Sequence, residues 1–206
     1  MPLTNRVTPM GEIVAAPWRG GLVGNRGVLH VEGPDGPVMG RRLWAHQAWV
    51  ACRLEFRGRW REPMLPGRWT ALFFWDEAAA FAAGHLPCGE CRHADHRRFV
   101  EAWEAAGQPG PRAPERHRAM HRARVRRDRS RVTVEAEAAG LPDGVFILAE
   151  DGAALLWQAA LHPWTPGGGY GAPRPRPAGR VRLLTPAPAV AAFRAGYVPA
   201  ARLGEA

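Results

Sequence analysis

The chain contains no lysine and only three cysteines among its 206 residues. All of its basic side chains other than histidine are therefore arginines, and the net charge is +9. The odd cysteine count favours a reducing compartment over a disulfide-bonded one. No apolar run approaches the roughly 18 residues of a membrane span, and the first twenty residues contain no apolar core of a signal peptide. We therefore expect a cytoplasmic protein that does not insert into a membrane.

The length fits one domain or two small ones and allows a substantial core. Short apolar runs alternate with turn signals in residues 12–74 and again from residue 132 onward, which predicts two β-rich parts around a helical middle. The fold class is thus α+β. We expect a β-rich region with a zinc turn in residues 1–110, a basic helical segment in 111–131 and a small region of strands with a final helix in 132–206, or one compact domain.

Three helices are predicted in the middle of the chain. Asp76 is a suitable N-cap for a helix over residues 77–83, and Gly84 is suited to end it. A second helix should run from His93 to Gly107, and a third over residues 114–127. Near the C-terminus, residues 145–148 and 153–157 predict a β-hairpin, residues 181–184 a strand, and Thr185 with Pro186 the start of a last helix.

Two of the cysteines form a C-x2-C pair, Cys88 and Cys91, in a turn after the first helix. Two thiolates at this spacing can hold one metal ion from a single turn, and Zn²⁺ is the ion most often bound in this way. Cys52 supplies a third thiolate. A redox pair or inert thiols are the alternatives, but a thioredoxin-like motif should follow a strand rather than a helix.

A closed tetrahedral zinc site needs one more ligand, which must come from the histidines. His85 is favoured because it lies three residues before Cys88. His93 is the alternative, followed by His96, because both lie in the first turn of the next helix. His30 and His46 can reach the cysteines only through tertiary folding.

Arginines are dense between residues 116 and 131. Such a run favours a phosphate-binding face for DNA or RNA, and four positions are its candidate contacts: Arg116, Arg122, Arg126 and Arg129. The alternative is a solvated helical face whose arginine content reflects a GC-rich coding sequence.

His117 and His121 are four residues apart, so a helix presents both on one face. A second metal site or an acid/base site with Glu115 is the functional interpretation, and His121 is its candidate catalytic residue. The surrounding arginines would repel a cation, so we expect two solvated histidines.

The stretch from Phe73 to Arg92 resembles the second half of the metal-binding module of Ada-type DNA repair proteins. In that module a strand with phenylalanine, an alanine-rich helix and a Pro-Cys-x-x-Cys-Arg turn follow in this order. The family's upstream Cys-Arg-x-x-Cys would correspond here to residues 52–56, where Phe56 replaces the fourth thiolate. The resemblance covers about forty residues, and the rest of the chain resembles uncharacterised bacterial proteins.

The resemblance implies zinc, and it implies that Cys52 matches the thiolate that accepts a methyl group from a DNA phosphotriester. Exchanging one thiolate for a neutral histidine lowers the negative charge around the zinc and should slow that reaction.

Three hypotheses about function remain. The leading one is a zinc-stabilised bacterial protein that binds nucleic acid and is linked to DNA repair. The second is an enzyme, either an alkyl acceptor through Cys52 or a hydrolase through His121. The third is a structural or protein-interaction module with a Trp-rich surface.

Overall fold

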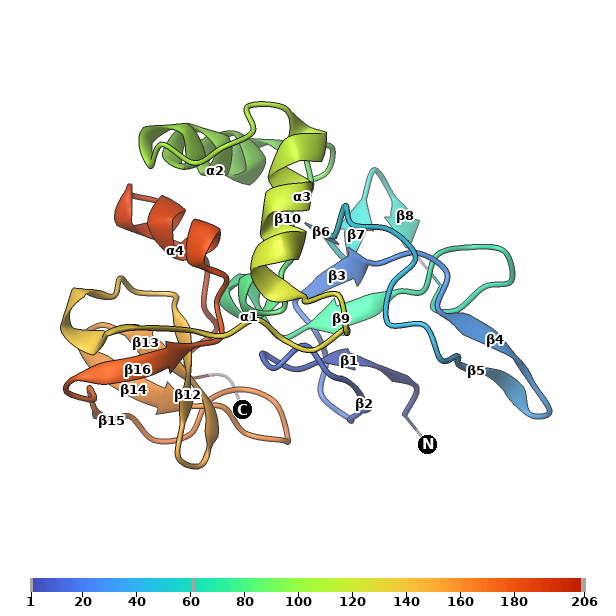
Figure 1. Ribbon diagram of the computed structural model, residues 1–206. Helices are drawn as coiled ribbons and strands as arrows, with labels where there is room; N and C mark the ends of the chain where they lie inside the picture. The colour runs from blue at the N-terminus through green and yellow to red at the C-terminus, as the bar shows by residue number, and fades with distance from the viewer. Residues whose placement is uncertain (1, 61, 205–206) are drawn as a thin grey trace.

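The computed structural model describes residues 2–60 and 62–204 (Figure 1). Its α-helices are α1 (Glu77–Ala82), α2 (His93–Ala105), α3 (Ala113–Arg124) and α4 (Ala187–Arg194). Most of the strands precede α1 or follow α3, so the predicted α+β class, with β-rich parts on either side of helices, is confirmed.

The first sheet has the strand order β10-β6-β3-β9-β1-β2. Its strands are β1 (Thr4–Val7), β2 (Ile13–Ala15), β3 (Leu22–Asn25), β6 (Val50–Cys52), β9 (Leu72–Phe74) and β10 (Leu86–Pro87). The central strand β3 pairs antiparallel with both β6 and β9, whereas β10 joins β6 in parallel. Two hairpins lie beside it, β4 (His30–Gly33) with β5 (Gly36–Met39) and β7 (Glu55–Phe56) with β8 (Arg59–Trp60).

The second sheet has the order β11-β16-β12-β13-β14-β15 and is antiparallel throughout. Its strands are β11 (Val134–Glu137), β12 (Phe146–Ala149), β13 (Gly152–Trp157), β14 (Ala160–Pro163), β15 (Arg174–Pro175) and β16 (Arg180–Leu183); a short 3-10 turn, Ala138–Gly140, follows β11. The predicted hairpin is confirmed as β12 and β13, with Phe146 opposite Leu155.

Helix α1 lies between the two sheets, in contact with β3 and β9 on one side and β12 on the other (Figure 1). All six of its residues are buried, and four of them are alanines. Small side chains let both sheets approach the helix closely. The other three helices gather on one side of the molecule, where α4 packs against α2 and α3.

The largest core cluster joins these helices to the second sheet. Phe81 of α1 packs against Phe99 of α2 at 5.3 Å and against Phe193 of α4 at 5.1 Å between ring centroids. Because aromatic rings of this size each bury a large apolar area, these contacts tie α1, α2 and α4 together.

The ends of the predicted helices are largely confirmed. Asp76 is the N-cap of α1, and its Oδ1 accepts from the backbone of Ala79 at 2.8 Å. Helix α3 ends at Arg124, three residues earlier than predicted, because Val125 turns to an extended conformation and bridges to Arg131. Thr185 does not cap α4; its hydroxyl accepts from the backbone of Phe146 instead. Within the described residues, no helix has the length and apolar character needed to cross a membrane.

Candidate metal centre

The parallel pairing of β10 with β6 brings two of the cysteines together. Pro87 lies opposite Ala51, and the backbone N–H of Cys88 donates to the carbonyl of Ala51 at 3.0 Å. One residue further along both strands, Cys88 therefore lies beside Cys52. A hydrogen bond of 3.1 Å from the Arg92 N–H to the Cys88 carbonyl closes the turn between these residues. This turn brings Cys91 beside Cys52 and Cys88.

The three sulfur atoms all lie within 4.8 Å of one another, and none forms a disulfide. Cys52 and Cys91 are buried, whereas Cys88 is partly exposed. Three thiolates on a tetrahedral zinc lie about 3.8 Å apart, given Zn–S bonds of about 2.3 Å. The backbone N–H of Arg53 also donates to Sγ of Cys91 at 3.4 Å, a contact that stabilises a thiolate. The cluster therefore fits a thiolate-bound metal ion.

Without a metal, the three cysteines differ in pKa. A hydrogen bond with Cys52 lowers the pKa of Cys88 to about 5, despite partial burial. The same hydrogen bond, together with burial, raises the pKa of Cys52, and burial raises that of Cys91. The metal-free cluster therefore contains one thiolate and two thiols. A cation can bind there, and the two thiols release their protons when it does.

The predicted fourth ligand is not brought to these sulfurs. His85 is fully buried, with its ring 4.5 Å from that of Phe74 and 5.3 Å from that of Trp49. Its Nε2 faces the Arg26 guanidinium, which lies 3.5 Å away. Burial, followed by the charges of Arg26 and Arg124, holds the pKa of His85 well below its usual value, so the ring is neutral.

The other candidate histidines are also outside the cluster of sulfurs. His93, the first residue of α2, is exposed. His96 lies over the cysteine turn: its Nδ1 is 3.0 Å from the Pro87 carbonyl, and its ring is 3.6 Å from where a Cβ on Gly89 would stand.

The His30 ring forms hydrogen bonds with the Thr70 hydroxyl and the Leu65 carbonyl, beside the first sheet. Among the described residues, the group that could hold a metal consists of the three cysteines.

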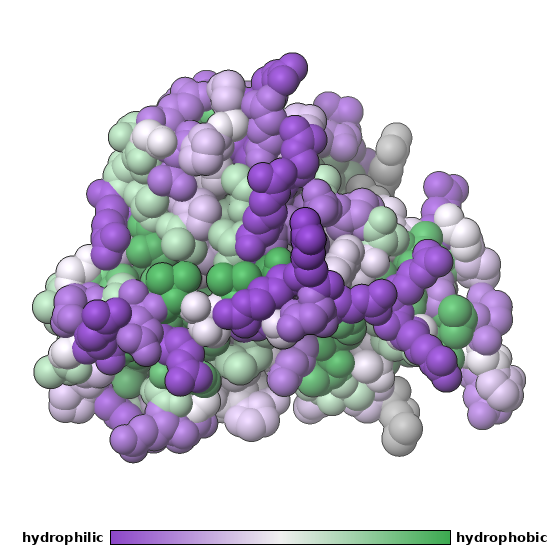
Figure 2. Space-filling model, in the orientation of Figure 1, coloured by the Kyte–Doolittle hydropathy of each residue, from purple (hydrophilic) through white to green (hydrophobic). Residues whose placement is uncertain are grey.

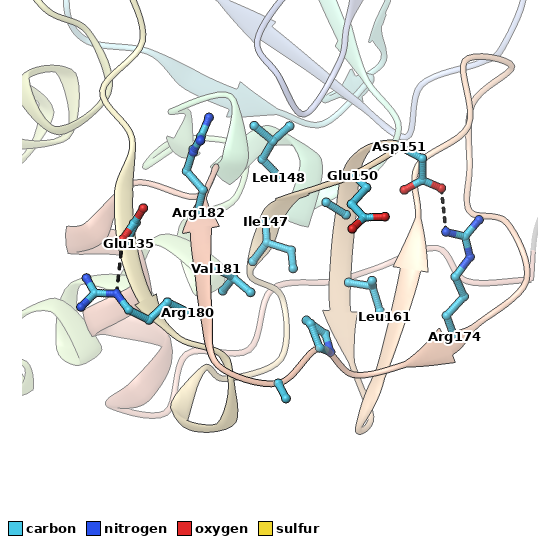
Figure 3. Close-up of a pocket in the computed structure, with 13 residues that line it drawn as sticks. Glu135, Ile147, Leu148, Glu150, Asp151, Leu161, Arg174, Arg180, Val181 and Arg182 are labelled. Atoms are coloured by element: carbon cyan, nitrogen blue, oxygen red, sulfur yellow. Dashed lines mark hydrogen bonds and ion pairs between the residues drawn. The ribbon is translucent and has the colours of Figure 1, made fainter.

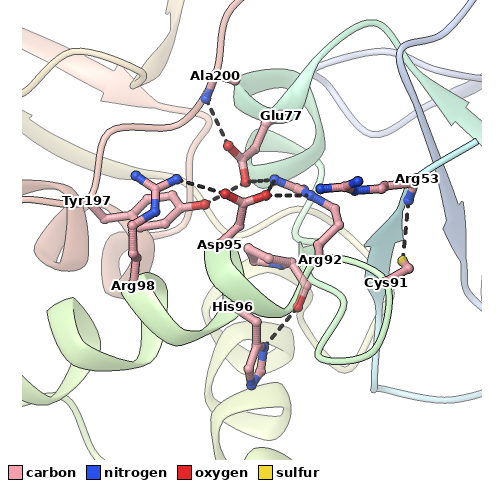
Figure 4. A network of polar contacts seen from close by, with 10 residues as sticks. Arg53, Glu77, Cys91, Arg92, Asp95, His96, Arg98, Tyr197 and Ala200 are labelled. Carbon is pink, nitrogen blue, oxygen red and sulfur yellow. Dashed lines mark hydrogen bonds and ion pairs between the residues drawn. The ribbon is translucent and has the colours of Figure 1, made fainter. Parts of the chain in front are cut away.

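A network of charges fixes the position of the cysteine turn (Figure 4). Arg92, directly after Cys91, donates from Nη2 to Glu77 at 2.5 Å and to Asp95 at 2.9 Å. Burial alone would lower the pKa of Arg92, but the two carboxylates outweigh it and raise the pKa. Glu77 also accepts from the Tyr197 hydroxyl at 2.6 Å. No local pattern in the sequence predicts this network, because its members come from three separate segments.

The arginine-rich segment divides into buried and exposed members. Arg116 is buried, and its Nη1 donates to the carbonyl of Pro111. Arg122, Arg126 and Arg129 are exposed. The space-filling view shows a strongly hydrophilic surface over α3 and the chain that follows it (Figure 2). Three of the four predicted phosphate contacts are therefore open to a partner.

His117 and His121 are partly buried rather than fully exposed. Burial, followed by the charge of Arg116, lowers the pKa of His117 to about 4. The His121 ring packs edge-on against Trp44 and Trp49, at 5.4 and 5.2 Å. The His121 ring is therefore a packing residue against the two tryptophans.

A separate hollow of about 670 Å³ lies on the second sheet (Figure 3). Ion pairs mark two of its sides, Arg180 with Glu135 at 3.2 Å and Arg174 with Asp151 at 2.7 Å. No thiol or imidazole lines it. The hollow is therefore separate from the three cysteines of the candidate metal centre.

Comparisons of the chain with protein-family models, with curated proteins and with solved structures find no match.

Proposed function

We propose that the protein binds one Zn²⁺ through Cys52, Cys88 and Cys91 as a structural centre, and that it binds nucleic acid through the exposed arginines at the end of α3. The observation that supports the metal centre is the convergence of three sulfurs, from β6 and from the turn between β10 and α2, to within 4.8 Å. A link to DNA repair rests on the resemblance of residues 52–92 to the Ada-type module, and a cytoplasmic location on the three free thiols.

Burial of the thiols favours a structural role over alkyl transfer. The Cys52 side chain is only 7 % exposed, and Cys91 only 8 %. A nucleophilic sulfur must approach an electrophile as large as a DNA phosphotriester, which a buried sulfur cannot do without rearrangement. Metal held at the junction of β6, β10 and α2 would instead lock three elements together, as structural zinc does.

We propose that a ligand outside the cysteine cluster completes the zinc site, either a water molecule or the His96 imidazole. A ring whose Nδ1 bonds to a backbone carbonyl has its tautomer set so that Nε2 is free to bind a metal. His96 has this arrangement through Pro87 and lies over the turn. Its replacement by alanine separates the two possibilities.

The metal test uses the metal content of the purified chain. We expect one zinc per chain, its loss in Cys88→Ser and Cys52→Ser, and its retention in His93→Ala, which alters an exposed side chain beside the same turn. His96→Ala should bind zinc more weakly if the imidazole is the fourth ligand and as tightly as the unaltered chain if it is water. Full zinc retention in both cysteine variants would refute the centre.

The nucleic-acid proposal is supported by Arg122, Arg126 and Arg129, which are exposed and form no ion pair with a carboxylate among the described residues. Each phosphate contact releases counterions, so affinity should fall steeply with salt, with a slope of about 0.9 per contact on logarithmic axes. Contacts of this kind hold the backbone and distinguish poorly between sequences.

The test measures affinity for DNA and RNA oligonucleotides between about 50 and 200 mM salt. Reversing Arg122, Arg126 and Arg129 to glutamate should reduce the slope by about 2.7 and leave zinc content unchanged. The matched control reverses Arg174, Arg180 and Arg182, which lie on the second sheet. An equal loss in the control indicates a net-charge effect only. Absence of binding by the unaltered chain at low salt refutes the proposal and favours a protein-interaction role.

A further inference from the structure

Three arginines from distant segments converge on the turn at residues 9–11. Arg26 follows β3 and donates from Nη1 to the Gly11 carbonyl at 3.3 Å. Arg124 ends α3 and donates from Nη2 to the Met10 carbonyl at 3.4 Å. Arg131 donates from Nη1 to the Pro9 carbonyl at 3.3 Å and from Nη2 to the Ala82 carbonyl, at the end of α1, at 2.9 Å. Three guanidinium groups thus surround one short loop.

Among the described residues, these guanidinium groups have no carboxylate in direct contact with them. Arg26 is 2 % exposed and Arg124 is 7 % exposed, and Arg131 is largely enclosed. In the part of the chain that the structure describes, no carboxylate forms an ion pair with any of them. The exposed Glu12 favours the charge of Arg131 only at a distance. Buried charges are normally paired, so three unpaired cations together are exceptional.

Burial acts on all three groups, and repulsion by a neighbouring arginine adds to it at Arg26 and Arg124. Burial and the charge of Arg131 lower the pKa of Arg26 to about 9, and burial lowers that of Arg131 to about 10. Burial and the charges of Arg26 and Arg131 hold the pKa of Arg124 well below its usual value. A guanidinium nevertheless keeps its proton at neutral pH, so the charge has to be balanced by another group.

Each guanidinium also has a buried N–H group without an acceptor. The unpaired atoms are Nη2 of Arg26, Nε of Arg124 and Nε of Arg131. Nδ1 of the neighbouring His85 is unpaired as well. A buried donor without an acceptor costs about 1–3 kcal/mol, and more when it is charged. Several such donors in one region call for a ligand with several acceptor oxygens.

The backbone is shaped to admit Arg124. A Cβ on Gly11, at φ +83°, would stand 1.6 Å from its Nη2, and a Cβ on Gly84, at φ +90°, would stand 2.3 Å from its Cδ. The Trp49 ring supports the guanidinium carbons of Arg26 and Arg124 at 4.4 and 5.3 Å from its centroid. Arg26 and Arg124 are therefore held in place by packing.

We propose that Arg26, Arg124 and Arg131 form a binding site for a small oxyanion of the phosphate class, either free phosphate or a terminal phosphate ester. A phosphate dianion offers negative charge and four acceptor oxygens, which match guanidinium forks better than any neutral ligand does. Burial restricts the site to a small ion or group. It is distinct from the exposed arginines proposed to contact a nucleic-acid backbone and does not depend on the metal centre.

The first experiment uses the purified, zinc-containing chain and inorganic phosphate. Thermal unfolding in phosphate is compared with unfolding in chloride of equal ionic strength, because binding to the folded state alone raises Tm. We expect a saturable rise of about 5–10 °C at a hundredfold excess over Kd. A nucleoside monophosphate and its nucleoside show whether a phosphate ester also enters. Identical melting in phosphate and chloride would overturn the proposal.

Variants locate the site. Arg26→Met and Arg124→Met should lose the phosphate-dependent rise in Tm, whereas Arg122→Met, an exposed arginine on the same helix as Arg124, should keep it. Loss in all three would indicate non-specific attraction and contradict the assignment. Should the buried variants fail to fold, phosphorus NMR of the unaltered chain decides: saturable binding of one phosphate per chain supports the site, and its absence refutes it.

Discussion

The Nη2 atom of Arg92 donates to Oε1 of Glu77 over 2.5 Å, and the two side chains are 6 and 4 % exposed. This ion pair connects the residue after Cys91 to the first residue of α1. The same carboxylate accepts from the Tyr197 hydroxyl and from the Ala200 backbone at 2.8 Å. The cysteine turn, the helix between the sheets and the C-terminal segment are therefore held at one buried carboxylate.

We expect Glu77→Gln to destabilise the fold strongly. Removing one partner of a buried ion pair leaves the other charge uncompensated, which costs about 3–5 kcal/mol. Urea unfolding at neutral pH measures the loss. The control is Glu101→Gln, whose pair with Arg97 is exposed and 3.9 Å long, and which should cost less than about 0.5 kcal/mol. Equal losses would show that Glu77 does not anchor the turn.

The thiols should react in a defined order once metal is removed. Iodoacetamide should modify none of them in the zinc-loaded chain. After chelation it should modify Cys88 first, because its pKa of about 5 makes it a thiolate and its side chain is partly exposed. Cys52, with a raised pKa and a buried sulfur, should react last. Mass spectrometry of timed samples identifies the order. Stable methylation of Cys52 by methylated DNA would instead favour the alkyl-acceptor hypothesis.

Local signals predicted the parts of the site that depend on short segments. The N-cap role of Asp76, the start of α2 at His93 and the paired spacing of Cys88 and Cys91 are all properties of a few consecutive residues. Cys52 was identified by elimination, and the structure brings it to the pair through the β6–β10 pairing. That pairing joins residues about 36 positions apart and leaves no local pattern.

His85 shows why proximity in sequence was a poor guide. The two residues of β10, Leu86 and Pro87, separate it from Cys88. Side chains alternate between the two faces of a strand, so residues three apart point to opposite sides. His85 accordingly enters the core beside Trp49 while Cys88 faces the other thiols. The convergence of Arg26 with Arg131 was equally hidden, because only the tertiary fold places them at one loop.

A glycine comparison tests how tightly Arg124 is enclosed. Gly84 and Gly107 each follow a helix with positive φ, at +90° and +63°, so alanine should cost about 1 kcal/mol at either position from the backbone alone. Only at Gly84 would the new Cβ meet Arg124; nothing lies within 4 Å at Gly107. Gly84→Ala should therefore lose more stability in urea unfolding than Gly107→Ala. Equal losses would mean that Arg124 moves aside without cost.

The stability of the fold should fall in mild acid, in part because of His117. Burial lowers the pKa of this ring to about 4, whereas an unfolded chain has a histidine pKa near 6.5. Between these two values the unfolded chain binds more protons than the folded one, so stability decreases as the pH falls through this window. For a partly solvated ring we expect a contribution of about 1–2 kcal/mol between pH 7 and pH 5. His117→Gln should reduce the pH dependence of urea unfolding by that amount, and His162→Gln, on the second sheet, should serve as the control. An unchanged pH dependence in His117→Gln would show that the ring takes up its proton equally well in the folded chain.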